Sequence, residues 1–264
     1  MVDLEIVGLI LAVLIGVSLG LMGGGGSILT VPLLVYFFHV NPFVASTYSL
    51  LIVGVSSLLG VIPYIKNKEY HIPAIVQMGL PSVIVVYITK YFLVPLIPDQ
   101  LYIAGNYSVN SDQLLLVFFS LLLIVAAFAM IRKTEASTHK KVSVIQLTSH
   151  GILIGFLTGL VGVGGGFLII PVLVLVCEIP MKKAVGSSLI IIVLNAIIGL
   201  MAVKDFVSFD QLLLVKISVL SIIGIVIGTL LSKRIEGGKL KRGFGWFLLI
   251  MGLAILFKEI LSCF

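Results

Sequence analysis

The sequence predicts an all-α integral membrane protein built from two inverted repeats of five helical segments each. Three observations lead to this prediction: the apolar composition, the spacing of the apolar runs, and a glycine-rich stretch that occurs twice. Of the 264 residues, 60% are hydrophobic and 11% are charged, and the mean hydropathy is +1.27. A soluble domain of this length could not bury so much apolar surface, so we expect the chain to lie in a lipid bilayer.

Apolar runs follow one another along the whole chain, five in each half. They occupy residues 4–22, 27–38, 43–62, 72–94, 113–131, 144–161, 167–178, 184–203, 211–232 and 243–262. Most approach the ~20 residues that a helix needs to cross the hydrocarbon core, but two of them, 27–38 and 167–178, are about half that length. The sequence therefore predicts about eight full spans and two short helices, which either cross the membrane or re-enter it.

The glycine-rich stretch is the clearest sign of an internal repeat. The stretch Gly23 to Ser27 aligns with the stretch Gly162 to Gly166 when the sequence is shifted against itself by 139 positions. In that register sixteen of forty-six positions between Ile15 and Gly60 are identical to their partners, without a gap. The chain is therefore expected to consist of a first transmembrane repeat (1–131), a basic linker (132–143) and a second transmembrane repeat (144–264).

The distribution of Lys and Arg indicates how the chain is threaded. If each glycine run turns the chain back, thirteen of the 17 basic residues fall on one side of the membrane; if each run only kinks a helix, the bias disappears. Because cytoplasmic loops collect Lys and Arg, we expect the chain to turn back, the basic side to be cytoplasmic and both termini to be extracytoplasmic. The segment 95–112 is expected to be an ordinary external loop.

The glycine runs also predict a binding site. Loose backbone at membrane depth survives only where protein or a water-filled cavity covers it, and a helix that begins there presents unpaired N–H groups and a partial positive charge. Two such N-termini brought together by an inverted repeat would bind an anion. The expected ligand groups are those of Gly24, Gly25, Gly26 and Ser27 in the first half and of Gly164, Gly165 and Gly166 in the second, with Ser27 and Gly166 as the N-caps. The alternative is that these glycines serve only close helix packing.

Polar residues follow both runs at matched positions and extend the predicted site. They are Ser49, Ser56 and Gln77 in the first half, and Ser187, Ser188, Asn195 and Lys216 in the second. Ser49 and Ser56 lie seven residues apart, hence on one helix face, as do their partners Ser188 and Asn195. For each hydroxyl alone, a bond to its own helix backbone is the commoner fate, and for Lys216 an extension to the membrane surface is the commoner alternative.

Several other functions are not indicated. The chain has no hydrolase, zinc-protease or nucleotide-binding motif and no Cys/His cluster with metal spacing, so we expect no enzyme activity, no metal and no cofactor. The net charge of +6 fits membrane orientation and does not imply nucleic acid. No carboxylate is expected in the middle of a span. If protons are the coupling ion, they would have to use His39, His150, Glu178 or the substrate itself.

The two glycine runs, each followed by a proline and a small polar motif, resemble the TauE/SafE family of sulfite and organosulfonate exporters. The motifs are Gly23 to Gly26 with Pro32 and Ala45 to Leu50, and Gly162 to Gly166 with Pro171 and Ala184 to Leu189. The resemblance implies a secondary transporter of sulfite or a related small anion in a prokaryotic inner membrane, working by alternating access and in the direction of export. An anion channel on the same scaffold, or a membrane enzyme or scaffold without flux, are the alternatives.

Overall fold

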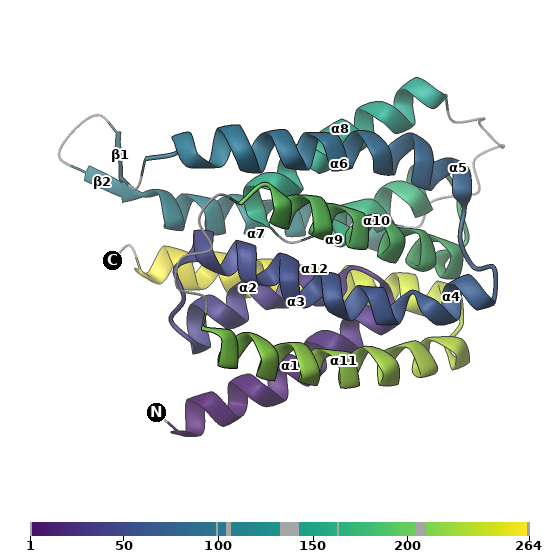
Figure 1. Ribbon diagram of the computed structural model, residues 1–264, viewed down its shortest axis with the longest axis horizontal. Helices are drawn as coiled ribbons and strands as arrows, with labels where there is room; N and C mark the ends of the chain where they lie inside the picture. Colours follow the sequence, from purple (N-terminus) through teal and green to yellow (C-terminus); the bar gives the residue numbers. More distant parts are fainter. Residues whose placement is uncertain are drawn as a thin grey trace.

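The computed structural model describes residues 2–98, 100–103, 107–132, 143–162, 164–203 and 210–262, and these are helical apart from one short hairpin (Figure 1). The elements are α1 (Val2–Met22), α2 (Gly25–Phe37), α3 (Pro42–Gly60), α4 (Ile62–Lys66), α5 (Ile72–Ala74), η1 (Ile75–Gly79), α6 (Leu80–Ile88), η2 (Thr89–Leu93), η3 (Val94–Leu96), β1 (Gln100–Ile103), β2 (Tyr107–Asn110), α7 (Ser111–Ile131), α8 (Val144–Val161), α9 (Gly166–Pro171), η4 (Val172–Val176), α10 (Met181–Met201), α11 (Gln211–Arg234) and α12 (Gly237–Ser262).

Seven helical segments of the described residues are long and apolar enough to cross a membrane. They run from 42 to 66, 72 to 96, 113 to 131, 144 to 161, 181 to 201, 211 to 234 and 237 to 261. Helix α1 adds 21 residues of similar character, of which the side chains are described from Val7 onward. The segments Ile28–Phe37 and Gly166–Val176 are shorter apolar helices. The predicted all-α membrane fold and the two short helices are therefore confirmed.

Three of the long spans begin at a capping residue. Asn41 accepts a hydrogen bond from the amide of Phe43 and Pro42 occupies the first turn of α3, so that helix starts there. At α8, Ser143 and Gln146 form a reciprocal capping box. Asp210 caps α11 by accepting from the amide of Leu213.

The first glycine run turns the chain back. A methyl group built on Gly26 in α2 would meet Ile15 and Leu19 of α1, whereas one on Gly8 near the start of α1 would meet Phe38 just after α2. The two helices are thus antiparallel neighbours. The second run does the same after α8, since Gly165 lies back against Thr158. The prediction that these runs are turns and not kinks is confirmed for the described chain.

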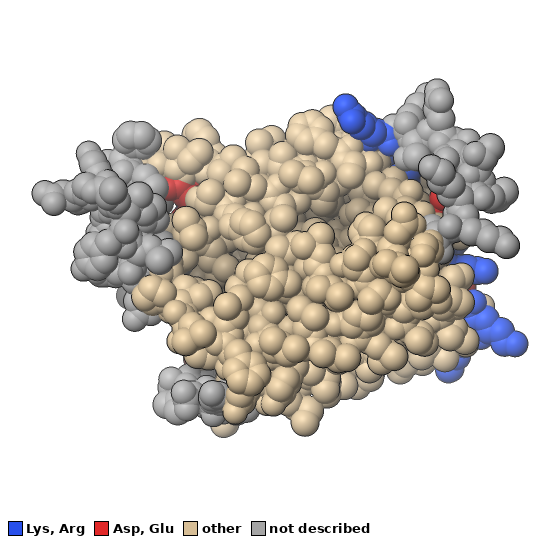
Figure 2. All heavy atoms as spheres, turned by 90° about the horizontal axis from the view of Figure 1, so that it is seen from above, with Lys and Arg blue, Asp and Glu red and all other residues tan. Residues whose placement is uncertain are grey.

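The basic residues gather at the end of the helical bundle opposite the two termini. Figure 1 places the N- and C-terminal ends at the same end of the bundle, and Figure 2 shows the Lys and Arg side chains at the other. Two of the chain turns at the basic end are joined directly, because Lys182 Nζ donates a hydrogen bond to the carbonyl of Lys233, 3.3 Å away. This arrangement has the charge asymmetry that orients membrane proteins.

The contacts of the two halves match in the register found in the sequence. Gly60 packs on Ile225, and Gly199 packs on Val86. The two contacts are equivalent, because Gly199 lies 139 positions after Gly60 and Val86 lies 139 positions before Ile225. The helix pairs match in the same way. Gly16 of α1 packs on Ser221 of α11, and the equivalent residues, Gly155 of α8 and Ser82 of α6, also pack together. Spans from opposite halves are therefore interleaved.

Hydrogen bonds follow the same relationship. The amide of His71 donates to Ser187 Oγ at 2.9 Å, and the amide of Asp210 donates to Tyr48 Oη at 2.9 Å, at positions that again differ by 139. His39 and Glu178, aligned in sequence, share a left-handed backbone with φ of 53°. Since α1 and α8 begin at opposite ends of the bundle (Figure 1), these matched contacts support the predicted inverted repeat.

The expectation of an ordinary loop at 95–112 is wrong. The span from Ile72 ends in a 3₁₀ turn at Leu96, and β1 and β2 then form an antiparallel hairpin in which Gln100 pairs with Asn110. Alternating polar and apolar residues of Tyr107–Asn110 favour the extended backbone over an irregular one. Most of the predicted linker, residues 133–142, lies outside the described residues.

Candidate functional site

The starts of the two short helices lie directly against each other. A methyl group on Gly24 would overlap the backbone of Gly166, and one on Gly166 would lie 2.6 Å from the Cα of Gly24 and 3.1 Å from the carbonyl oxygen of Gly23. Only glycine allows two backbones to approach so closely. The structure therefore brings the two predicted halves of the site together at one point in the core.

Both helices begin without a side-chain cap. Gly24 is the N-cap of α2 and Gly165 the N-cap of α9, and neither N-terminus receives a hydrogen bond from a capping side chain. The expectation that Ser27 and Gly166 are the caps is wrong, because glycine already has the backbone freedom to stop the turn earlier, so Ser27 lies within the first turn of α2. The side-chain surroundings of Gly25 and Ser27 lie outside the described residues.

The second turn has the backbone that only glycine adopts readily. Gly162, Gly164 and Gly165 have φ of 73°, 60° and 75°, and in the first turn Gly23 has φ of 68°. After the turn, α9 continues through the π-helical turn η4, so the helix from Gly166 to Val176 is long enough to have an N-terminal dipole. Pro171, whose effect the sequence left open, lies at the transition between α9 and η4, where a π turn accommodates its missing N–H.

The hydroxyl groups of Ser188 and Thr158 lie at the two glycine turns, and that of Thr158 has no hydrogen-bond partner among the described residues. Ser188 Oγ donates to the carbonyl of Val185 at 2.8 Å and also approaches that of Gly23 at 3.3 Å. Thr158 lies against Gly165 and is buried, with no partner for its hydroxyl among the described residues; Ser49, which is aligned with Ser188 in the repeat, is likewise buried without a described partner. A buried hydroxyl without a partner is costly, so the Thr158 hydroxyl is available to a polar ligand at the second turn.

Two other predicted residues are satisfied by the protein. Ser56 Oγ donates to the carbonyl of Ile52 in its own helix, the common fate of such a residue. Asn195 exchanges hydrogen bonds with Ser82 across the halves, at 3.0 and 3.3 Å, and both side chains are fully buried. This pair fixes α10 against α6. In the first half, the residue aligned with Asn195 is Ser56.

Ser187, Gln77 and Lys216 lie outside this cluster of contacts. Ser187 Oγ donates to the carbonyl of Lys183 and accepts from the amide of His71, so it is part of the connection at the basic end. The carbonyl of Gln77 accepts from Thr148 Oγ1 at 3.4 Å. The Lys216 side chain is exposed on α11, as expected for a lysine that extends to the membrane surface.

Two buried charged groups were missed by the sequence reasoning. Lys90 is only 5% exposed, and its Nζ donates to Ser46 Oγ at 2.8 Å. Glu259 in α12 is 6% exposed, and Tyr36 donates to its Oε1 at 2.6 Å. The signal that could have found both is their position inside the apolar runs 72–94 and 243–262, where a charge needs a specific reason. Glu259 thus joins His39, His150 and Glu178 as a group that could carry a proton.

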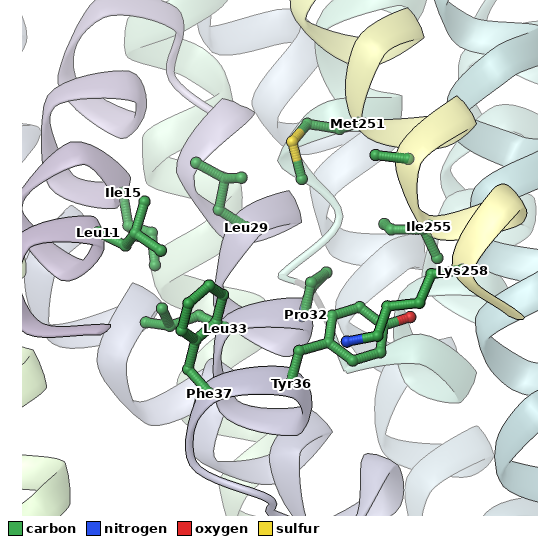
Figure 3. Close-up of a pocket in the computed structure, with 11 residues that line it drawn as sticks. Leu11, Ile15, Leu29, Pro32, Leu33, Tyr36, Phe37, Met251, Ile255 and Lys258 are labelled. Carbon is green, nitrogen blue, oxygen red and sulfur yellow. The ribbon is translucent and has the colours of Figure 1, made fainter. Parts of the chain in front are cut away.

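An apolar cavity of about 320 Å³ lies between α1, α2 and α12, apart from this cluster (Figure 3). Its polar lining consists of Tyr36 and Lys258, whose Nζ lies 3.4 Å from the centre of the Tyr36 ring. The described lining includes none of the predicted site residues. Such walls suit an apolar chain and not an oxyanion, so this cavity is not the predicted site. Among the described residues, no group of three His, Cys, Asp or Glu side chains could hold a metal ion.

Comparison with known proteins gives consistent results over nearly the whole chain. Residues 8–255 match the family described as "Sulfite exporter TauE/SafE". A "Probable membrane transporter protein" of Xylella fastidiosa is 29% identical over 259 residues, which cover 93% of this chain and 92% of that one. "Probable membrane transporter protein YunE" of Bacillus subtilis is 29% identical over 221 residues (72% and 74%), and MJ0441 of Methanocaldococcus jannaschii, of the same description, is 27% identical over 202 (74% and 70%). No solved structure gives a significant match.

Proposed function

Given that this chain belongs to the sulfite exporter TauE/SafE family, we propose that it is a secondary transporter of sulfite or a related small organosulfonate anion, which it moves outward. It is a multi-pass membrane protein with seven long apolar helices among its described residues, and its relatives are named as membrane transporters. Membership of the family leaves three properties open: the identity of the transported anion, the direction of transport and the place where the anion binds.

The observation that carries the proposal is the contact between Gly24 and Gly166. It brings the N-termini of α2 and α9 to one point, and neither is capped by a side chain. Backbone N–H groups and the positive ends of two helix dipoles favour an anion there, with no need for a dedicated side chain. Three oxygens on a compact sulfur centre suit such converging donors, because each oxygen accepts hydrogen bonds from a different direction.

The unpaired hydroxyl of Thr158 supports the same place. Thr158 lies against Gly165, which is the N-cap of α9, and its hydroxyl is buried and lacks a partner among the described residues. A bound oxyanion would accept a hydrogen bond from it and remove the cost of leaving a buried hydroxyl unpaired. The second observation is thus independent of the helix dipoles.

Alternating access follows from the way in which the two halves meet. In the proposed mechanism the glycine crossing forms the centre of the inverted repeat, with matched contacts on either side of it, as at Gly60 and Gly199. One set of contacts would open toward one side of the membrane while the other stays closed, and the exchange of the two states carries the anion across. The direction of transport is then set by the gradients of the anion and of any coupled proton.

The proposed location is a prokaryotic inner membrane with the basic end of the bundle in the cytoplasm. The Lys and Arg side chains gather at that end, opposite the termini (Figure 2), and cytoplasmic loops collect such residues. Both termini would then be extracytoplasmic, and sulfite would enter its site from the end that carries Lys182 and Lys233.

Transport in proteoliposomes tests the proposal. Purified protein should exchange labelled sulfite against an internal pool of sulfite, and a panel of sulfoacetate, taurine and sulfate defines the substrate. Counterflow against a gradient is expected of a transporter, whereas an anion channel gives flux without counterflow. Protein that gives neither flux nor counterflow with any member of the panel would contradict the proposed function.

A further inference from the structure

Lys90 has no explanation in the usual behaviour of lysines in membrane helices. It lies toward the hairpin end of the membrane-length segment Ile72–Leu96, in the π-helical turn η2, and its side chain is 95% buried. Lysines near helix ends normally extend their ammonium groups to water at the membrane surface. This one points into the protein instead, where Nζ donates to Ser46 Oγ at 2.8 Å.

Among the described side chains, the ammonium group finds fewer partners than it has donors. It has three N–H donors, and the hydrogen bond recorded for it among the described residues is the one to Ser46. The Ser46 hydroxyl in turn donates to the carbonyl of Phe43 at 2.7 Å, so it serves Lys90 as a neutral acceptor. Among the side chains that the structure describes, no carboxylate forms an ion pair with Lys90. A buried charge without a counterion is expensive, and a bound anion would offset that cost.

The position of Lys90 relates it to the second glycine turn. Its partner Ser46 lies in contact with Gly162, the first residue of the turn, and its neighbour Thr89 packs on Gly159 just before that turn. The ammonium group therefore lies next to the backbone that leads into the N-terminus of α9. A π turn at this point, a feature that recurs at functional sites, belongs to the helix segment that carries Lys90.

The other half offers a neutral group at the equivalent place. Adding 139 to 90 gives Thr229, whose buried hydroxyl has no partner among the described residues and whose backbone packs on Gly20, shortly before the first glycine turn. The two halves therefore differ in charge at this position, although the surrounding helix packing is the same in both. One half contributes a cation and the other a hydroxyl.

We propose that Lys90 is the fixed positive charge of the anion site, and that the site therefore takes oxyanions of a single negative charge, such as sulfonates or hydrogen sulfite. This inference rests on the proposed function. One lysine neutralises one negative charge, so a dianion such as sulfate would leave an uncompensated charge in a medium of low dielectric constant. Backbone N–H groups at the helix starts then position the oxygens, while Lys90 supplies the charge.

Binding to purified protein tests the inference, with methanesulfonate as the singly charged probe and sulfate as the doubly charged one at equal ionic strength. Wild-type protein should bind methanesulfonate more tightly than sulfate. Lys90→Met should lose about 10- to 100-fold in affinity for methanesulfonate, as expected for a lost hydrogen bond to a charged group, while Lys90→Arg should retain binding. Lys258→Met is the matched control, because that ammonium lies over the Tyr36 ring, and its affinity should be unchanged.

Thermal unfolding in detergent is a second measurement, and its expected result differs between a Lys90 that binds anion and a Lys90 with only a structural role. Without anion, Lys90→Met should unfold at a temperature at least as high as wild type, because an uncompensated charge has been removed, and methanesulfonate should stabilise wild type only. A folded Lys90→Met protein with wild-type affinity for methanesulfonate would show that Lys90 has only a structural role. That result would contradict this inference but not the proposed function. If Lys90→Met does not fold, the comparison of probes decides: wild type that prefers sulfate overturns the inference. Wild type that binds no member of the panel overturns the proposed function as well.

Discussion

Gly24 and Gly166 touch through their backbones, although 142 positions separate them in the chain. The contact joins the N-cap of α2 to the first residue of α9 and places two uncapped helix N-termini side by side. The close approach and the missing side-chain caps have the same origin, because residues without side chains can neither keep two backbones apart nor cap a helix. The packing and the proposed anion site therefore depend on the same glycines.

Gly24→Ala should separate the two helix starts. Its methyl group would overlap the Gly166 backbone, and overpacking of a closely packed core costs about 1–3 kcal/mol. We expect a lower unfolding temperature in detergent and weaker sulfite binding. Gly238→Ala is the control, since a methyl group there meets nothing within 4 Å. A Gly24→Ala protein with the stability and affinity of wild type would show that the contact has little importance.

The two glycines of the second turn should differ in their sensitivity to substitution. Gly164 and Gly165 both have positive φ, which costs a residue with a side chain about 1–2 kcal/mol. A methyl group on Gly164 finds its nearest neighbours at 3.2 Å (Ile192) and 3.4 Å (Val53), whereas one on Gly165 overlaps Thr158 Oγ1. Gly165→Ala should therefore be the more destabilising of the two in thermal unfolding.

Thr158→Ala separates the two costs at Gly165. In the double variant the steric overlap is gone and the backbone strain remains, so the combined loss of stability should be smaller than the loss in Gly165→Ala alone. Thr158→Ala by itself removes a buried hydroxyl without a described partner, so it should leave stability close to wild type while weakening sulfite binding. Equal melting temperatures of the Gly165→Ala single and double variants would exclude the predicted clash.

The fold was predictable from sequence because its signals are local and repeated. Apolar runs of membrane length and the shift of 139 positions predicted the segments, and contacts such as Gly60 with Ile225 and Gly199 with Val86 occur in that same register. The antiparallel course of α1 and α2 followed from the distribution of charge. The hairpin Gln100–Asn110 did not, because a short two-stranded ribbon of mixed composition has a weak signal.

The candidate site was predictable only in part. Sequence shows which residues are polar but not which of them the fold satisfies: Ser56 bonds its own helix, while Ser49 stays unpaired. Lys90 was not singled out from the sequence, although it lies inside an apolar run, and only the structure shows its ammonium turned inward to Ser46. The reverse holds for Lys216, which was included in the predicted site because it aligns with Gln77 and which is exposed. Side-chain direction in a bundle depends on the neighbouring helices, which no local pattern encodes.

The orientation of the bundle makes a prediction about accessibility from the two sides of the membrane. In a background with Cys177 and Cys263 replaced by Ser, cysteines at Lys68 and Gly238 should react with a membrane-impermeant thiol reagent only after the cells are opened. Cysteines at Leu96 and Gln211, at the end that carries the termini, should react in intact spheroplasts. Labelling of positions 68 and 238 from opposite sides would contradict the antiparallel course of both halves.

The hydrogen-bonded pair of Asn195 and Ser82 makes the last prediction, because it distinguishes a structural polar pair from a lining of the anion path. Both side chains are fully buried and satisfy each other across the two halves. Removal of one partner leaves a buried polar group unpaired at a cost of about 1–3 kcal/mol, whereas removal of both can be nearly neutral. Asn195→Ala and Ser82→Ala should each lower the unfolding temperature, and the double variant should be destabilised by less than the sum of the two. Sulfite affinity in the folded variants should stay at the wild-type value, since the pair serves to hold α10 against α6. Additive losses of stability together with a loss of affinity in Asn195→Ala would instead place this residue in the path of the anion.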